Sequence, residues 1–173
     1  MLPDTGRPPI LKTARLVLRP PEARDIPAWF LRARDRDAAQ LAGDPVPEGI
    51  NAGVDWLRRI RENARTGKRL LWSIDAPQAA DSIGTVALAL HKLAISFVLG
   101  RDHWGRGYAT EAAAEILRYG FNELGLSKVS AEVVARNTAS LHVLGKLGFQ
   151  HEASFVDESD NERCERHGLY RKT

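Results

Sequence analysis

Hydrophobic and polar residues alternate over several short segments of this chain, a pattern typical of half-buried strands. In the first such segment the alternation stops at Pro20 and Pro21, which lack the N–H group that a strand ladder needs. The pattern predicts strands at 14–20, 69–76, 81–92, 93–100 and 128–135, and two more within 153–170 around Ser159, Asp160 and Asn161.

Four further segments have apolar residues every three or four positions, which is the spacing of an amphipathic helix. They are 26–34, with Asp25 as its N-terminal cap, then 51–67, 109–121 and 138–147, which Asn137 opens. In the second of them, Gly67 is placed to end the helix. Its arginines 58, 59, 61 and 65 are expected on a solvated face, and its buried face is predicted to carry Val54, Leu57, Ile60 and Ala64.

The predicted elements follow the order β α α β β β α β α β β. This order is typical of an α/β fold of the α+β kind, in which helices flank a mixed, mostly antiparallel sheet. A chain of 173 residues with 43% hydrophobic composition can bury one substantial core. We therefore expect a loose tail over 1–12 and a single domain over 13–173.

Composition excludes several classes of function. The formal net charge of +3 comes from interspersed charges of both signs, and it is far from the basic stripe of a nucleic-acid-binding protein. His91 and Lys92 interrupt the most apolar stretch, 83–100, which is therefore expected to form two strands rather than a membrane span. Cys164 is the only cysteine, so no internal disulfide can form. With no signal-peptide pattern at the start, these features favour a cytoplasmic protein.

The segment "DHWGRGYATEAAAE" (102–115) joins a predicted strand to a predicted helix through two glycines. In such a turn, backbone N–H groups from about Trp104 to Thr110 point into one concavity, and the helix dipole adds partial positive charge. A pyrophosphate suits that place. The alternative is a tight turn that only packs a helix onto a sheet, and the glycines alone do not separate the two interpretations.

A second motif favours the phosphate interpretation. "NTASLHVLGKLGF" (137–149) follows one intervening strand, and together with "WGRGYATEA" (104–112) it resembles the GNAT N-acetyltransferases. Within that superfamily both motifs resemble the ribosomal-protein N-terminal acetyltransferases, called RimJ/RimL-like. The opening segment "TARLVLRPPEARDIPAW" (13–29) is similar as well, so the resemblance covers most of the chain from Thr13 onward.

The resemblance implies that acetyl-CoA is the acetyl donor and that no metal takes part. The strand ending at Gly100 and the strand around Val133 would splay apart and open a slot for the pantetheine arm. Asn137 would contact that arm, and Ser140 would lie near the thioester sulfur as the catalytic residue, although it is also placed as an ordinary helix-surface serine. The backbone groups of Phe97, Val98 and Leu99 would hydrogen-bond the arm. The residues implied to hold the pyrophosphate are Trp104, Gly105, Arg106, Gly107, Tyr108, Ala109 and Thr110.

The acceptor must be a neutral amine to attack the thioester, and this bears on its class. An α-amine has a pKa of roughly 8 and a lysine about 10.4, so an α-amine needs only a weak base. The strand "LAISFVLG" (93–100) carries no Asp or Glu, which favours a protein N-terminus or a small primary amine. The connection 91–93 is shorter than in RimJ/RimL-like chains, which leaves the acceptor class open, and His91 is the alternative base.

Other functions stay open at this point. A non-catalytic module that binds and senses acyl-CoA would carry the same binding motifs. An unrelated nucleotide-binding protein is less well supported, because a phosphate loop alone does not require the second helix at 137–149. A homodimer is compatible with the sequence.

Overall fold

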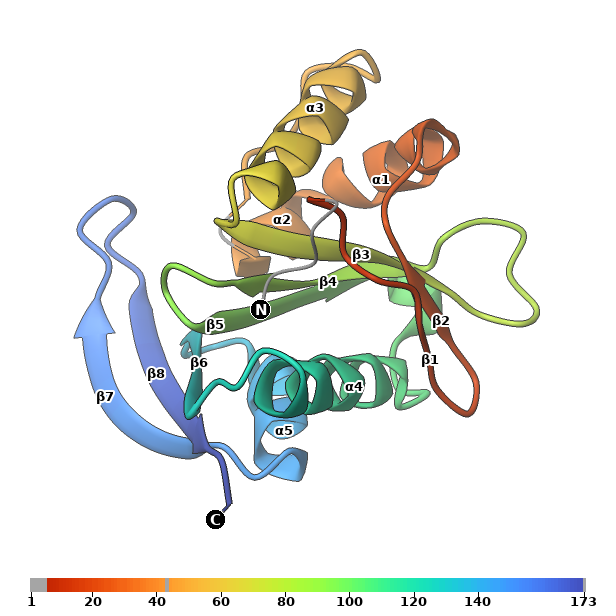
Figure 1. The fold of residues 1–173 in the computed structure, drawn as a ribbon. Coiled ribbons are helices and arrows are strands. Elements are labelled where there is room, and N and C mark those ends of the chain that lie inside the picture. Colours follow the sequence, from red (N-terminus) through yellow and green to blue (C-terminus); the bar gives the residue numbers. More distant parts are fainter. Residues whose placement is uncertain (1–5, 43, 173) are drawn as a thin grey trace.

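A single sheet runs through the structure, with helices on both of its faces (Figure 1). The computed structural model describes residues 6–42 and 44–172. Within these residues the sheet has eight strands in the order β1-β2-β3-β4-β5-β6-β8-β7. Their bounds are β1 Leu11–Lys12, β2 Val17–Arg19, β3 Arg69–Asp75, β4 Gly84–Ala89, β5 Ala94–Leu99, β6 Lys128–Val134, β7 Gln150–Val156 and β8 Arg163–Tyr170.

Helices α1, α2 and α3 lie over one face of the sheet, called here the α3 face, and α4 and α5 lie over the other, the α4 face (Figure 1). Short 3₁₀ turns precede α1 and α4, at Ala23–Asp25 and Arg101–His103. The helix bounds are α1 Ile26–Ala33, α2 Arg36–Ala42, α3 Ala52–Arg65, α4 Tyr108–Asn122 and α5 Thr138–Lys146.

The sheet opens between β5 and β6. Strands β1 to β5 pair antiparallel in chain order, and β6, β8 and β7 form a second antiparallel group. The two groups meet where β5 and β6 run parallel, and there the only paired residues are Ala94 and Ser130. Beyond that pair β5 continues to Leu99 and β6 to Val134 without pairing to each other. We call this opening the fork, and it confirms the splayed central pair expected from the resemblance.

Alternation along the central strands divides the core between the two faces. Even-numbered residues of β3 and β4, such as Trp72 and Val86, are fully buried with Ile116 of α4. On the α3 face, Leu71 and Ala87 pack with a smaller cluster from α3, in which Trp29 stacks on Trp56 with ring centroids 5.1 Å apart. Both faces of the central strands are therefore covered.

Most predicted elements are present, and the exit of α5 has the expected form. Gly148 has a φ of 85°, the N–H of Phe149 donates to Leu144 O at 3.1 Å, and both side chains are buried. These contacts are those of a Schellman ending. The arginines 58, 59, 61 and 65 are exposed on α3 as expected.

Four expectations differ from the structure. Val54 was predicted on the buried face of α3, but its side chain is 61% exposed, because Gly53 and Trp56 face the core instead. Asp25 caps no N–H of α1 and lies in a buried ion-pair cluster. Strand β1 and helix α2 were not predicted.

Part of the tail expected over 1–12 is ordered. Residues 1–5 lie outside the described residues. Leu11 and Lys12 pair with β2, and the carbonyl of Pro9 accepts a hydrogen bond from the indole Nε1 of Trp72 at 2.7 Å.

Candidate active site

The turn between β5 and α4 requires glycine at two positions. Gly105 and Gly107 have φ values of 72° and 77°, in the left-handed region that L side chains rarely adopt. A Cβ at Gly105 would meet nothing within 4 Å, so the space beside it is open. Gly107 is the N-terminal cap residue of α4, and this conformation turns the chain sharply into the helix.

Backbone N–H groups gather at this turn. In the part of the chain that the structure describes, the N–H groups of 105–110 donate to no protein acceptor, and the first bond of the helix runs from Glu111 N to Gly107 O at 3.0 Å. Free N–H groups at a helix start, together with the helix dipole, make a site for an anion. The turn is therefore suited to a pyrophosphate.

Polar contacts that the sequence reasoning missed, called here the brace, hold this turn to the connection between β1 and β2. One carboxylate oxygen of Glu111 accepts hydrogen bonds from Thr13 Oγ1 at 2.6 Å and from Arg15 N at 2.9 Å, and the other accepts from Arg15 Nε at 2.7 Å. Arg15 also donates to the carbonyl of Arg106 at 3.0 Å and lies 4.7 Å from the ring centroid of Tyr108. Burial raises the pKa of Glu111, but these hydrogen bonds outweigh it and hold the pKa below its ordinary value.

On the β5 side of the fork, alternate residues turn their backbone groups toward the opening. Gly100 N donates to Ile83 O on the β4 side, and Leu93 O accepts from Ser130 N on the β6 side. Because the backbone groups of successive residues point to opposite sides of a strand, those of Phe97 and Leu99 point toward β6. Val98 lies between them, and its backbone groups face β4. The carbonyl of Leu99 accepts a hydrogen bond from the indole of Trp104 at 2.9 Å, and that indole is 43% exposed beside the turn.

On the β6 side, the chain runs directly into the start of α5. Asn137 is the N-terminal cap residue, and its side-chain oxygen accepts a hydrogen bond from Ser140 N at 3.1 Å. This confirms that Asn137 opens the helix, and it leaves the amide nitrogen of the side chain for other partners. Ser140 is half-buried, and its hydroxyl makes no hydrogen bond to the described residues. Both arms of the fork thus end at helix N-termini.

Other candidates lie apart from this constellation. His91 is exposed in the turn before β5, at the closed end of the fork, and its Nδ1 lies 3.0 Å from the carbonyl of Lys68. Cys164 is buried in β8, and burial raises the pKa of its thiol, which disfavours the nucleophilic thiolate. Within 6–42 and 44–172, no three His, Cys, Asp or Glu side chains are grouped to hold a metal.

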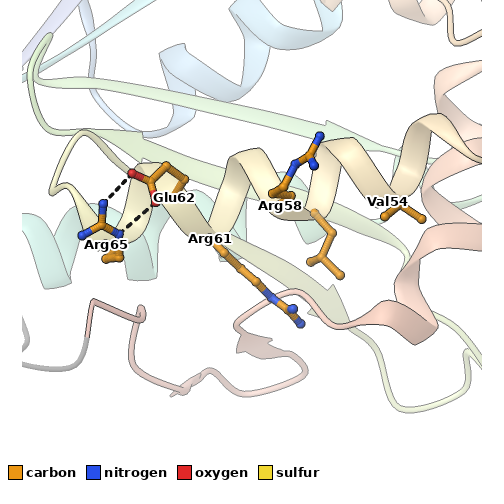
Figure 2. A pocket seen from close by; sticks show the side chains of 6 residues that line it. Val54, Arg58, Arg61, Glu62 and Arg65 are labelled. Atoms are coloured by element: carbon orange, nitrogen blue, oxygen red, sulfur yellow. Dashed lines mark hydrogen bonds and ion pairs between the residues drawn. The ribbon is translucent and has the colours of Figure 1, made fainter.

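An open hollow of about 370 Å³ runs along α3, and Figure 2 shows the side chains that line it. All of these side chains come from that one helix, and one of its arginines, Arg65, forms an ion pair with Glu62 at 2.7 Å. A hollow on one exposed helix face offers no groups from a second element. It is therefore a weaker site candidate than the fork.

Comparison with known proteins identifies the family. A family model described as an acetyltransferase (GNAT) domain matches residues 15–150. The chain belongs to the GNAT acetyltransferase family. This acetyltransferase is 32% identical over 149 residues to the uncharacterized N-acetyltransferase YoaA of Bacillus subtilis, an alignment that covers 83% of this chain and 84% of YoaA. It is thus an acyltransferase that uses acetyl-CoA and acetylates nitrogen.

Solved structures share the fold of this acetyltransferase. RimJ of Mycobacterium smegmatis, in complex with CoA-disulfide, is similar with a TM-score of 0.80 and 22% identity, covering 95% of this chain and 88% of that one. Spermidine N-acetyltransferase of Vibrio cholerae, in complex with CoA and spermine, has a TM-score of 0.78 and 19% identity, covering 91% and 96%. At these identities the likeness shows the fold and not the acceptor. No helix within the described residues is long and apolar enough to cross a membrane.

Proposed function

We propose that this acetyltransferase binds acetyl-CoA at the open end of the fork and transfers the acetyl group directly to a primary amine. We further propose that it is of the RimJ/RimL-like type. The observation that carries the proposal is the arrangement of the fork, whose arms end at two helix N-termini. One of these follows a glycine turn with unpartnered N–H groups.

The turn from Trp104 to Thr110 binds the pyrophosphate of the donor. Six of its residues, 105–110, offer N–H groups that donate to no acceptor among the described residues, and the brace from Arg15 and Glu111 holds the turn in shape before the ligand arrives. Preorganisation of this kind reduces the ordering that binding requires. The Arg106 side chain is exposed, so its contribution is secondary to that of the backbone.

The pantetheine arm lies along β5. The backbone groups of Phe97 and Leu99 face the opening. Asn137 follows the other arm, and its side-chain nitrogen, which the helix cap leaves without a role, donates to the pantetheine. Val98 was expected to bond the arm through its backbone as well, but the ladder alternation directs those groups to β4. We therefore assign Val98 to the wall of the slot and the hydrogen bonds to its two neighbours.

The reaction takes place in a ternary complex. Acetyl-CoA supplies an activated acyl group, and the amine nitrogen forms a C–N bond to its carbonyl carbon while the C–S bond breaks. The nitrogen loses a proton to solvent, and the departing thiolate gains one from the hydroxyl of Ser140, which recovers its proton from water. Holding donor and acceptor together provides most of the rate enhancement, since a thiolate is a good leaving group.

The acceptor is an amine that is substantially neutral near pH 7, either a protein N-terminus or a small primary amine. This choice of a low-pKa amine is supported by β5, because that strand contains no Asp or Glu that could act as a strong base. The shared fold does not select between these two acceptors, because a spermidine N-acetyltransferase (TM-score 0.78) and RimL, a ribosomal L7/L12 alpha-N-protein acetyltransferase (TM-score 0.81), both resemble this chain.

The test is the release of free CoA thiol from acetyl-CoA across a panel of N-terminal peptides, amino acids and diamines. The proposal predicts amine-dependent release, with an acetylated product seen by mass spectrometry. Tight binding of acetyl-CoA without release on any amine would instead support a sensing module.

A further inference from the structure

The acceptor side of the fork carries a positively charged group that the catalytic proposal does not use. Arg69 is the first residue of β3, and its Nη2 donates to Ser96 Oγ on β5 at 2.9 Å, so the side chain reaches across the intervening β4. Ser96 lies two residues beyond Ala94, where β5 last pairs with β6. The guanidinium therefore stands at the edge of the fork.

Alternation places both residues on the α3 face. Arg69 shares a face with Leu71, which is two residues away, and Ser96 pairs with Ala87. Leu71 and Ala87 both pack against the α3 cluster. On the proposed function, phosphates sit at the start of α4 on the opposite face, so the amine must approach the thioester from the α3 face. Arg69 thus lies on the path of the acceptor.

The guanidinium is not fully satisfied by the protein. Its Nε is buried and finds no acceptor among the described residues. Its Nη1 makes no hydrogen bond to the described residues either. This nitrogen is not fully buried, so an incoming group can reach it. Burial lowers the pKa of Arg69, because desolvation disfavours the charge, yet an arginine stays protonated.

The surrounding charges leave an excess of positive charge. Asp44, which follows α2, is the carboxylate near Arg69, and it acts through space without a hydrogen bond to it. Arg59 of α3 is a second positive charge that acts through space on both Asp44 and Arg69. Two guanidinium groups therefore share one carboxylate.

We propose that Arg69 binds a carboxylate of the acceptor, so that the preferred acceptor is a primary amine with a carboxylate a few bonds away. A guanidinium matches a carboxylate in a planar, two-point geometry, and a partly desolvated one gains most from that match. A diamine would instead bring a second positive charge beside two arginines. This inference rests on the proposed function and assigns Arg69 as its specificity-determining residue.

Two sources of such an acceptor differ in where the carboxylate lies. A free amino acid carries it on the α-carbon, and a peptide carries it on an acidic side chain close to its N-terminus. The experiment therefore measures kcat/KM in three arms: amino acids against their carboxamides, N-terminal peptides with Asp against the same peptides with Asn, and a diamine. The wild-type protein should prefer the acid in one of the first two arms by about 10- to 100-fold.

Variants separate the role of Arg69 from general charge effects. Arg69→Gln should reduce the acid preference to near unity, and Arg69→Lys should retain part of it. Arg61→Gln, which removes an equal charge from an exposed position on α3, should leave the preference unchanged. An unchanged preference in Arg69→Gln would overturn the inference, and so would a wild-type protein that prefers the acid in neither of the first two arms or that prefers the diamine to both acids.

A binding measurement distinguishes failure of this inference from failure of the proposed function. Calorimetry on the CoA-saturated protein needs no turnover. It compares an N-acetyl amino acid with its carboxamide, and an N-acetylated Asp peptide with its Asn counterpart. Stronger binding of the acid that is lost in Arg69→Gln supports the carboxylate site even if no amine in the panel is acetylated. Equal binding within both pairs contradicts it, whether or not transfer occurs.

Discussion

Replacing Glu111 with glutamine should loosen the turn that binds the donor phosphates. Glu111 joins the first turn of α4 to Thr13 and Arg15, and Arg15 in turn holds the carbonyl of Arg106. A glutamine oxygen can still accept from Thr13 and from Arg15 N, but its NH₂ group then faces the donor Nε of Arg15. The variant therefore loses one charge-assisted hydrogen bond.

Such a bond contributes roughly 1.5–3 kcal/mol. The side chains are 46% exposed in Arg15 and 18% in Glu111, so solvent screening reduces the expected loss in the free energy of unfolding to about 1–2 kcal/mol. A turn that must be ordered on binding costs affinity, and we expect the Kd for acetyl-CoA to rise roughly 2- to 10-fold. Urea denaturation measures the first quantity and calorimetry the second.

Glu115→Gln is the matched control. Glu115 pairs with Arg118 further along α4, at 2.7 Å, and their exposed fractions are 15% and 46%. Within the described residues this pair makes no hydrogen bond to the turn, and its loss should cost about 0.5 kcal/mol and leave acetyl-CoA affinity unchanged. The reasoning is wrong if Glu111→Gln binds acetyl-CoA as tightly as the wild type, or if both glutamine variants lose affinity equally.

Two further predictions concern catalysis and stability. Ser140→Ala should lower kcat by a factor at or below the low end of the 10²–10⁴-fold range of acid–base catalysis, with little change in the KM for acetyl-CoA. The reason is that the hydrogen bond from the Ser140 hydroxyl strengthens only as the sulfur gains charge. Full activity in steady-state kinetics would remove Ser140 from the mechanism. Asp25 is 2% exposed, and burial raises its pKa, but hydrogen bonds from Arg19, Glu22 N and Ser73 outweigh this and lower it. Because the folded pKa lies below the unfolded value of about 3.9, this stabilisation is complete above that pH and is lost as the pH falls through the folded pKa. Asp25→Asn should lower the free energy of unfolding by about 3–5 kcal/mol at pH 7. It should also weaken the loss of stability at acid pH, measured by denaturant titrations at several pH values, and a loss as steep as that of the wild type would contradict the assignment.

The sheet and most helices could be predicted because their signals are local. Alternation in 69–76 and 128–135 and the glycines around α4 depend on neighbouring residues alone. Strand β1 has only two residues, which are too few for any pattern. Val54 has the helical spacing of the buried residues of α3, but Gly53 and Trp56 take the buried positions at the start of that helix. Gly53 packs against Ile26, where a Cβ would come within 2.3 Å, and no local pattern reports such a contact.

The site could be predicted only in part. The glycine turn and the capping role of Asn137 are visible in the motifs, and the fork was expected from the resemblance to a family. The brace could not be predicted, because Arg15 and Glu111 are 96 positions apart and each is an ordinary charged residue in its own segment. The same holds for Arg69 and Ser96, which the pairing of three strands brings together.

The most direct test of the donor site compares two glycines that share the same backbone strain. Gly107 and Gly125 have φ values of 77° and 68°, so valine at either position costs stability, by more than the roughly 1–2 kcal/mol of an unbranched residue. Only Gly107 belongs to the phosphate-binding turn, whereas Gly125 follows the end of α4. With folding checked by circular dichroism, calorimetry should show severe loss of acetyl-CoA binding in Gly107→Val and wild-type affinity in Gly125→Val. Unchanged affinity in a folded Gly107→Val variant would contradict the assignment of this turn to the donor.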